Sequence, residues 1–328
     1  MGTSDITQAE LNRAVTTINN VLGYYQEKVV GQLYLGHTIL IALMTNGHIL
    51  LESVPGLAKT TAAKVITESV SGSFSRIQCT PDLLPSDIIG TQTYNMATNT
   101  FENKLGPVYA NFVLLDEINR SSAKTQSAML EAMQEHEITI GGQLYKLPDV
   151  FCVIATQNPV EQEGTYLLSE AQLDRFLLKT KLVYPNAKNE MEILNRIEQN
   201  VFEQKRAVAT LEELAFLQQL CKRVYVDDAI KQYIIDIVQA TRHTDKILPP
   251  ELAQYVTMGA STRAAIAFME VAKAVALLNG RNYCIPDDVK SMRYGVLRHR
   301  IMLNFAAVAD EVKEETIIDA IVGAVKTP

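Results

Sequence analysis

Short apolar runs alternate with longer segments of helical periodicity over residues 1–185. The clearest run, Phe112–Leu115, is wholly apolar, as is typical of a strand that is buried on both faces of a parallel sheet. Runs of the same kind predict further strands at Ile49–Leu51, Ser75–Thr80, Phe151–Ala155 and Phe176–Val183. Apolar residues at helical spacing predict the helices between them, at residues 7–46 with a break at Val29–Gln32, at Lys59–Val70 and at Ala123–Glu135. Strands separated by helices predict an α/β fold with a parallel sheet.

Beyond Pro185 the pattern is helical only. Thr210 and Glu213 form a capping box that opens one helix, and Ser261 is a suitable N-cap for another. The predicted helices cover residues 187–204, 227–242 and 261–279, with further starts at Thr210, Pro286 and Asp310. We therefore expect two domains, an α/β core with N-terminal helices at residues 1–185 and an all-α domain at residues 186–328.

Two segments within the α/β part do not follow the alternation of strands and helices. Glu137–Leu147 alternates apolar and polar residues around Gly141-Gly142, which predicts a two-stranded hairpin. Thr91–Pro107 is polar, and its pattern assigns it to neither a helix nor a strand.

The stretch Ile49–Thr61, I-L-L-E-S-V-P-G-L-A-K-T-T, passes from an apolar run through a Pro-Gly turn into a helical pattern. Such a turn directs backbone N–H groups at an anion, and the helix N-terminus adds a partial positive charge. Lys59 would reach the outer phosphates of a nucleotide, and the Thr60 hydroxyl would bind Mg²⁺. The loop departs from the pattern G-x-x-x-x-G-K-[ST] at Ser53 and Ala58, so it is a weak match when taken alone.

Two more strand ends carry polar residues that suit the same chemistry. Asp116 and Glu117 follow one apolar run, and Gln157-Asn158 follows another. Because ligands of open α/β sheets bind at the carboxyl ends of strands, we expect these residues to meet the phosphate loop. Asp116 would hold the water shell of Mg²⁺, Glu117 would polarise the attacking water, and Asn158 would bind the γ-phosphate or that water. Asp116 and Glu117 are also candidate caps for the following helix, and for Glu117 the two roles are compatible.

Composition narrows the class of protein without assigning a function. The 328 residues are 47% hydrophobic and 20% charged, which is typical of a soluble globular chain with room for two domains. The net charge of −7 argues against non-specific nucleic-acid binding, which needs concentrated Lys and Arg. The longest apolar stretches are too short or too interrupted by charge to span a membrane. No secretory signal is visible and the four cysteines lie far apart, so we expect buried thiols in a cytoplasmic protein.

Several stretches of the sequence resemble the MoxR family of AAA+ ATPases. They are E-S-V-P-G-L-A-K-T, T-P-D-L-L-P-S-D-I-I-G-T, L-L-D-E-I-N-R, K-T-Q-S-A-M-L-E-A-M-Q-E, A-T-Q-N-P-V-E-Q-E-G-T-Y and E-A-Q-L-D-R-F-L-L-K. Together they cover residues 30–185 nearly without interruption. G-A-S-T-R-A at Gly259–Ala264 extends the match into the all-α domain, and V-V-G-Q at Val29–Gln32 resembles the adenine-side segment of the family.

The resemblance implies a P-loop AAA+ core, a parallel β-sheet flanked by helices, followed by an all-α lid domain. It implies that Glu117 is the catalytic Walker B carboxylate, Asn158 the first sensor and Arg175 the arginine finger that reaches a neighbour's γ-phosphate. Arg263 matches the second sensor, and Thr60 and Asp116 match the Mg²⁺ site. The residues implied in ATP binding are Gly31, Gln32, Ser53, Pro55, Gly56, Leu57, Ala58, Lys59, Thr60 and Thr61.

The activity that the resemblance implies is Mg²⁺-dependent ATP hydrolysis that remodels or matures protein partners, as a chaperone does. Such proteins usually form a homo-oligomeric ring, typically a hexamer, with ATP between subunits, and often act with von Willebrand factor A-type partners. Family members carry an insert before Walker B and a hairpin before the first sensor, which correspond to Thr91–Pro107 and Glu137–Leu147.

Two other functions fit parts of the sequence. Ser53 replaces the usual glycine of the family, and a serine held at positive φ would cost about 1–2 kcal/mol. Weakened nucleotide binding would make the chain a nucleotide-gated scaffold with little hydrolysis. A DNA-directed motor is the third reading, since related AAA+ proteins share the hairpin. Against it, Thr139–Lys146 contains one basic residue, Lys146.

Several basic residues also have alternative interpretations. Arg175 would act as the finger or would pair with Asp174 or Glu170 of its own subunit. Arg120 would contact a neighbouring subunit or a local carboxylate. A basic cluster near the C-terminus predicts a solvated face or a subunit contact, and it consists of Arg293, Arg298, His299 and Arg300.

Overall fold

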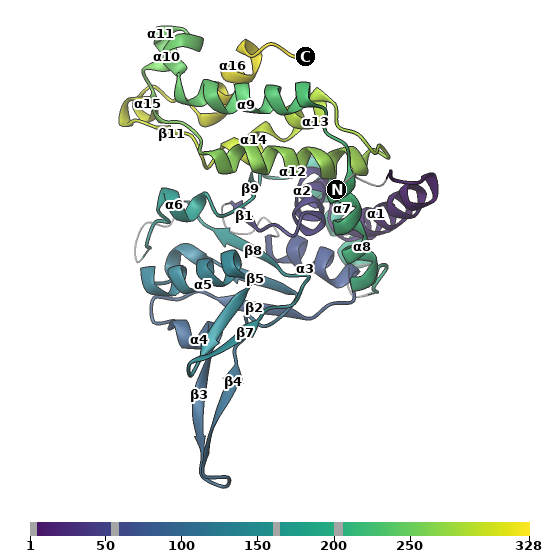
Figure 1. The fold of residues 1–328 in the computed structure, drawn as a ribbon, viewed down its shortest axis with the longest axis vertical. Coiled ribbons are helices and arrows are strands. Elements are labelled where there is room, and N and C mark those ends of the chain that lie inside the picture. Colours follow the sequence, from purple (N-terminus) through teal and green to yellow (C-terminus); the bar gives the residue numbers. More distant parts are fainter. Residues whose placement is uncertain (1–4, 54–58, 160–164, 200–205) are drawn as a thin grey trace. The chain divides into compact units, whose positions relative to one another are not determined.

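The computed structural model describes residues 5–53, 59–159, 165–199 and 206–328 (Figure 1). The chain divides into two compact units. The sheet unit comprises residues 19–176 and 180–215, and the helical unit comprises residues 1–18, 177–179 and 216–328. Three elements run through a boundary between the units, and these are α1 (Gln8–Lys28), β9 (Leu178–Lys181) and α8 (Leu211–Arg223).

A five-stranded sheet has the strand order β2-β5-β8-β1-β9. Its other strands are β1 (Ile49–Glu52), β2 (Phe74–Gln78), β5 (Phe112–Asp116) and β8 (Cys152–Gln157). β2 pairs with β5, β5 with β8, and β8 with β1, in each case in parallel. The predicted α/β fold with a parallel sheet is therefore confirmed. Because β8 lies between β5 and β1, the three strand ends that carry the candidate residues are neighbours.

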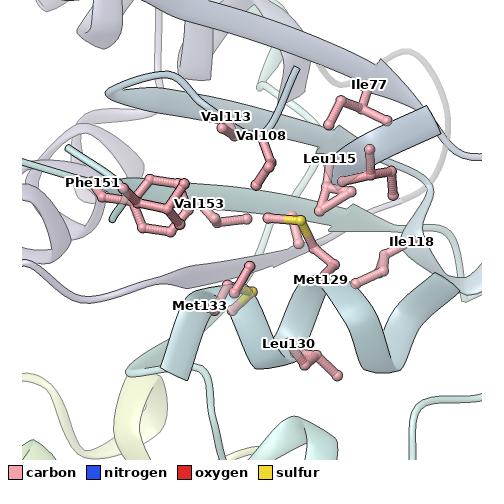
Figure 2. Packing of buried hydrophobic residues seen from close by; sticks show 14 of the residues in the cluster. Ile77, Val108, Val113, Leu115, Ile118, Met129, Leu130, Met133, Phe151 and Val153 are labelled. Carbon is pink, nitrogen blue, oxygen red and sulfur yellow. The ribbon is translucent and has the colours of Figure 1, made fainter. Parts of the chain in front are cut away.

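The helices of the sheet unit are α2 (Leu33–Met44), α3 (Lys59–Ser69), α4 (Pro85–Ile89), α5 (Ala123–Glu135), α6 (Glu170–Leu173) and α7 (Ala187–Glu198), with a 3₁₀ turn η1 (Ile118–Arg120). The helices that bury apolar side chains are α2 to α5, whereas α6 and α7 are without buried residues. Figure 2 shows Met129 and Met133 of α5 packed with Leu115 and Val153 of the sheet, and all four side chains are buried. This apolar core fixes β5 and β8, and therefore the residues at their carboxyl ends.

Two hairpins leave the sheet unit. β6 (Glu137–Ile140) and β7 (Gln143–Lys146) form the predicted hairpin, and its turn residues Gly141 and Gly142 both have positive φ, as a type I′ turn requires. The unassigned segment forms a second antiparallel hairpin, β3 (Gly90–Asn95) with β4 (Thr100–Leu105). Most of its side chains are exposed, so no buried face imposes the apolar–polar alternation that marks a strand in sequence.

The helical unit follows most of the predicted pattern. Its elements are α9 (Asp228–Arg242), α10 (Thr244–Ile247), α11 (Pro250–Ala253), β10 (Val256–Met258), α12 (Thr262–Leu278), α13 (Pro286–Ser291), α14 (Arg293–Leu297), β11 (Met302–Leu303), α15 (Phe305–Ala309) and α16 (Glu314–Ala324). The Ser261 side chain accepts the Arg263 N–H at 3.1 Å and caps α12 as predicted. The helix predicted from Asp310 instead begins at Glu314, because α15 ends just before Asp310 and Glu311 takes a positive φ of 54°.

The basic cluster near the C-terminus is not the solvated face that its charges predict. Arg293 pairs with Asp319 at 2.7 Å and Arg298 pairs with Glu315 at 2.6 Å. The other two members of the cluster, His299 and Arg300, are buried. These groups are therefore committed to contacts within the chain.

The four cysteines are free and buried, as predicted. Burial raises the pKa of each thiol to about 12, so these side chains are inert packing groups. Among the helices of the described ranges, none combines the length and the apolar character that crossing a bilayer requires.

His48, directly before β1, is a buried histidine held in its neutral form. The Val153 N–H donates to Nδ1 at 3.0 Å, so Nε2 carries the proton and donates to the Met133 carbonyl at 2.9 Å. Burial, with a smaller contribution from the nearby His136 ring, lowers the pKa of His48 from 6.5 to about 4. Protonation would cost the Nδ1 hydrogen bond and place a charge in the core.

The free energy of unfolding is expected to fall as the pH falls. Because the folded-state pKa of His48 lies below its unfolded value, the stabilisation is complete above pH 6.5 and is lost between 6.5 and about 4. The loss at the acidic end is about 3 kcal/mol for this one group. Urea unfolding of the wild type and of His48→Gln at several pH values measures the contribution of His48 to the free energy of unfolding. Equal pH slopes for the two proteins would contradict this assignment.

Candidate functional site

The phosphate-loop segment joins the end of β1 to the start of α3. β1 ends at Glu52, and α3 begins at Lys59. The candidate residues Pro55, Gly56, Leu57 and Ala58 lie outside the described residues. On the flanks, the strand before this segment and the helix after it are the ones that the sequence predicts.

Ser53 does not carry the backbone strain considered from the sequence. Its φ is not among the positive values of the described residues. Its N–H donates to the Gln157 carbonyl at 3.2 Å, which continues the alignment of β1 with β8. Its carbonyl accepts a hydrogen bond from Lys59 Nζ at 3.1 Å, and both residues are buried. A positive-φ penalty at Ser53 is therefore a wrong expectation, and it gives no reason to expect weak nucleotide binding.

The Asp116 carboxylate, at the end of β5, accepts three side-chain hydrogen bonds. Its Oδ1 accepts the Thr156 hydroxyl at 2.8 Å. Its Oδ2 accepts the Thr60 hydroxyl at 3.3 Å and Arg76 Nη2 at 2.7 Å. Burial would raise the pKa of Asp116, but the hydrogen bonds from Thr156 and Arg76 and the charge of Arg76 hold the pKa below its usual value. Asp116 is therefore an ionised carboxylate at neutral pH, next to the first turn of α3.

Glu117 takes a left-handed backbone conformation, with φ 59° and ψ 54°. A residue with a Cβ pays about 1–2 kcal/mol for this conformation, which is characteristic of functional sites. Its N–H donates to the Thr156 hydroxyl at 2.9 Å, so one threonine holds both Asp116 and Glu117. Glu117 stands at the N-cap of η1 without a side-chain cap hydrogen bond, and Ser122 caps α5. The capping interpretation is therefore wrong for Glu117.

The Glu117 side chain is held by two neighbours. Arg120 Nη1 donates to Oε2 at 3.2 Å, which gives Arg120 a local carboxylate partner. Gln78 Nε2 approaches the same oxygen at 3.4 Å from the end of β2. Both hydrogen bonds reach Oε2, so Oε1 is the less occupied of the two carboxylate oxygens among the contacts of the described residues.

Asn158 follows β8, the strand between β5 and β1. It is buried, and its carbonyl accepts Asn119 Nδ2 at 3.3 Å. Beside it, Gln157 Nε2 donates to Glu52 Oε2 at 2.7 Å and so joins the ends of β8 and β1. These contacts place Asn158 between the phosphate-loop strand and the strand that ends in Asp116.

The two candidate arginines lie in different units. Arg175 follows α6 in the sheet unit and is half-buried. Within the described ranges it forms no ion pair, and its Nε is buried without a hydrogen-bond partner, so neither Asp174 nor Glu170 neutralises it. Arg263 is exposed in the first turn of α12 of the helical unit.

The candidate adenine-side segment, Val29–Gln32, has a backbone that favours glycine at Gly31. Gly31 has a φ of 74°, and a Cβ on it would collide with the Asn189 side chain. Gln32 Nε2 donates to the Val183 carbonyl at 2.9 Å. Gly31 and Gln32 are therefore fixed against the chain that follows β9, whereas Thr61 is exposed on α3.

Three residues that the sequence interpretation missed join this site. Thr156, Arg76 and Gln78 contact the carboxylates directly. Thr156 lies within the A-T-Q-N-P stretch, so its place one residue before Gln157 was a usable signal. Arg76 and Gln78 alternate on β2, and only the strand order places them beside Asp116 and Glu117.

Comparisons with known proteins agree with this arrangement. The sequence model of the ATPase family associated with various cellular activities (AAA) matches residues 48–178, and that of the AAA lid domain matches residues 252–321. Over 96% of its length the chain is 43% identical to Chaperone MoxR1 of Mycobacterium tuberculosis, of which it covers 83%. Over 97% of its length it is 44% identical to the uncharacterized protein YeaC of Bacillus subtilis, of which it covers 95%.

A solved structure supports the same conclusion. The crystal structure of a protein from Cytophaga hutchinsonii, which is described as an inferred ATPase, superposes on this chain with a TM-score of 0.91. The two sequences are 44% identical. The match covers 98% of this chain and 97% of that one. Identity at this level over nearly the whole chain, together with the AAA match, shows that this protein belongs to the MoxR family of AAA+ ATPases.

Proposed function

We propose that this chain binds ATP with Mg²⁺, hydrolyses it, and uses the cycle to remodel or mature protein partners. The observation that carries the proposal is one chain of hydrogen bonds, in which Asp116 accepts from the hydroxyls of Thr60 and Thr156, and the Thr156 hydroxyl accepts from the Glu117 N–H. A hydroxyl, an ionised carboxylate and a second carboxylate in a left-handed turn are the groups that phosphoryl transfer to water requires.

The donor set at this point suits Mg²⁺. Thr60 Oγ1 and Asp116 Oδ2 lie 3.3 Å apart and are both hard oxygen ligands. Within the described ranges, no group of three His, Cys, Asp or Glu side chains could enclose a metal ion. Phosphate oxygens would therefore complete the coordination, as is usual for Mg²⁺. When bound, Mg²⁺ supplies neutralisation of phosphate charge.

The side chains of the chain have separable roles in this proposal. Lys59, which now donates to the Ser53 carbonyl, would turn its ammonium to the outer phosphates. Glu117 would orient the attacking water and take its proton at Oε1, while Arg120 holds Oε2. Asn158 would donate its amide to the γ-phosphate or to the same water. Arg175 would stabilise the transition state in a neighbouring subunit, and Arg263 would contact the nucleotide from the lid.

We propose a ring of identical subunits, typically six, on the family resemblance. The buried Arg175 Nε has no hydrogen-bond partner in the described part of the chain, which is consistent with a role at a neighbouring subunit. Residues 1–185 would form the nucleotide-binding core, and residues 186–328 would form the lid. The AAA lid match at residues 252–321 supports the second assignment. Protein clients, among them von Willebrand factor A-type partners, and a cytoplasmic location are proposed on the family resemblance.

The two rival functions have less support. The scaffold hypothesis was motivated by strain at Ser53, and φ there is not positive. The DNA-motor hypothesis needs a basic hairpin, and β6–β7 with its turn carries one basic residue, Lys146.

Partner capture in the ATP state tests the remodelling proposal. The Glu117→Gln variant, held in ATP, is expected to retain protein partners that the same variant without nucleotide does not retain. The wild type should release those partners with ATP but not with a non-hydrolysable analogue. Capture that is equal with and without nucleotide, or release by the wild type with the analogue, would argue against coupling of hydrolysis to partners.

A further inference from the structure

An arginine from the neighbouring strand donates a hydrogen bond to the same Asp116 oxygen that accepts from Thr60. Arg76 lies on β2, and its Nη2 donates to Asp116 Oδ2 at 2.7 Å. The same Oδ2 accepts the Thr60 hydroxyl at 3.3 Å. The two residues of the proposed Mg²⁺ site, Thr60 and Asp116, are therefore in contact through Oδ2. This oxygen already accepts a hydrogen bond from the Arg76 guanidinium.

The charges at this oxygen are in competition. Arg76 places a unit positive charge on Oδ2, and a divalent cation between Thr60 and Asp116 would add two more within a few ångströms. Like charges at such a separation repel strongly unless water screens them, and Asp116 is buried. The other carboxylate oxygen, Oδ1, accepts the Thr156 hydroxyl, so the guanidinium and the Thr60 hydroxyl share Oδ2.

The ion pair is not needed to hold the strands together. β2 and β5 are aligned over five residue pairs from Phe74↔Phe112 to Gln78↔Asp116. The Arg76 side chain is 51% exposed, and ion pairs this open to solvent contribute little to stability. A structural role alone therefore leaves the placement of Arg76 on a metal-facing oxygen unexplained.

Arg76 also has a second acceptor within reach. The same Nη2 donates to Gln78 Oε1 at 3.1 Å, on the same face of β2. An Arg76 side chain displaced from Asp116 would still have Gln78 Oε1 and water as acceptors. The release of Asp116 is therefore a short side-chain movement without loss of every partner.

We propose that Arg76 is a positioning residue that supplies the counter-charge of Asp116 before the metal arrives and must be displaced for Mg²⁺ to bind. It thereby sets the Mg²⁺ concentration at which nucleotide is held. This inference rests on the proposed Mg²⁺–ATP site, and it concerns the order of events there.

Mg²⁺ titration of nucleotide binding tests the role of Arg76 without measuring activity. Binding of a fluorescent ATP analogue is followed at increasing Mg²⁺ for the wild type, Arg76→Gln, Arg76→Lys and the control Lys104→Gln, which removes an exposed charge from β4. Arg76→Gln is expected to need about tenfold less Mg²⁺ for half-maximal binding, because the competing charge is gone. Arg76→Lys and Lys104→Gln are expected to stay within about twofold of the wild type.

Two results overturn the inference, and a third has a wider meaning. An unchanged Mg²⁺ requirement for Arg76→Gln shows that the guanidinium does not compete with the metal. A raised requirement shows that Arg76 only orients Asp116. If circular dichroism finds Arg76→Gln unfolded, Arg76→Met replaces it with the same expectation. Failure of the wild type to bind the analogue at any Mg²⁺ concentration overturns the proposed function and this inference together.

Discussion

Replacing Glu117 with glutamine is expected to lower the rate of ATP hydrolysis by at least about 100-fold while ATP affinity stays within about threefold. The amide has the size of the carboxylate and can still accept from Arg120, but it cannot take a proton from water. The backbone anchor of Glu117 on Thr156 does not involve the side chain, so the left-handed turn and Asp116 stay in place. The substitution should therefore lower the rate of the chemical step and leave ATP binding nearly unchanged.

Phosphate release and equilibrium ATP binding, measured on the same preparation, check this expectation. Glu131→Gln is the matched control, because it makes the same chemical change at an exposed position of α5. Hydrolysis by Glu117→Gln at the wild-type rate would remove Glu117 from the catalytic assignment. Equal loss of binding and hydrolysis would make it a structural residue.

Replacing Arg175 with alanine is expected to lower hydrolysis by roughly 10³-fold or more, the range known for arginine fingers. Arg175 makes no ion pair within the described part of the chain, and its buried Nε has no hydrogen-bond partner. Its removal therefore breaks little inside the subunit, and ATP affinity should change far less than the rate.

Comparison with Arg175→Lys separates charge from geometry. Lysine keeps the positive charge but lacks the planar fork that binds two phosphate oxygens at once, so it should recover only part of the rate. Gel filtration of both variants establishes whether assembly is intact. A wild-type rate for Arg175→Ala would exclude the finger role, and loss of assembly alone would make Arg175 an interface residue.

The sequence was sufficient to predict the sheet and the main groups of the site. Phe112–Leu115 is apolar throughout because β5 is buried on both faces, and the charge change at Asp116 marks its end. Parallel strands bring their carboxyl ends to one edge, so Thr60, Asp116 and Glu117 could be expected to meet. The structure places them in one hydrogen-bonded group around Thr156.

The surroundings of these groups could not be predicted from the sequence. The pairing of Arg76 with Asp116 depends on β2 lying next to β5, which is a property of the strand order. The expectation about Ser53 failed for a related reason, because the missing glycine does not reveal that the Ser53 N–H pairs with β8 at a φ that is not positive. Pairing between distant strands, and not the local sequence, determines both the contact of Arg76 with Asp116 and the backbone conformation at Ser53.

The β3–β4 hairpin escaped prediction for a different physical reason. Its side chains are largely exposed on both faces, so the periodicity that reports burial is absent. Backbone pairing across six residue pairs, from Gly90↔Leu105 to Asn95↔Thr100, holds it together.

The central claim is that an ATP-hydrolysing site is completed across subunits, and mixing two inactive variants tests it most directly. Glu117→Gln subunits keep Arg175, and Arg175→Ala subunits keep Glu117, so a mixed ring contains some sites with both groups. Each variant alone is expected to release almost no phosphate, and the mixture is expected to recover a measurable share of the wild-type rate. A mixture as inactive as its two components, with mixed assembly verified, would contradict the account.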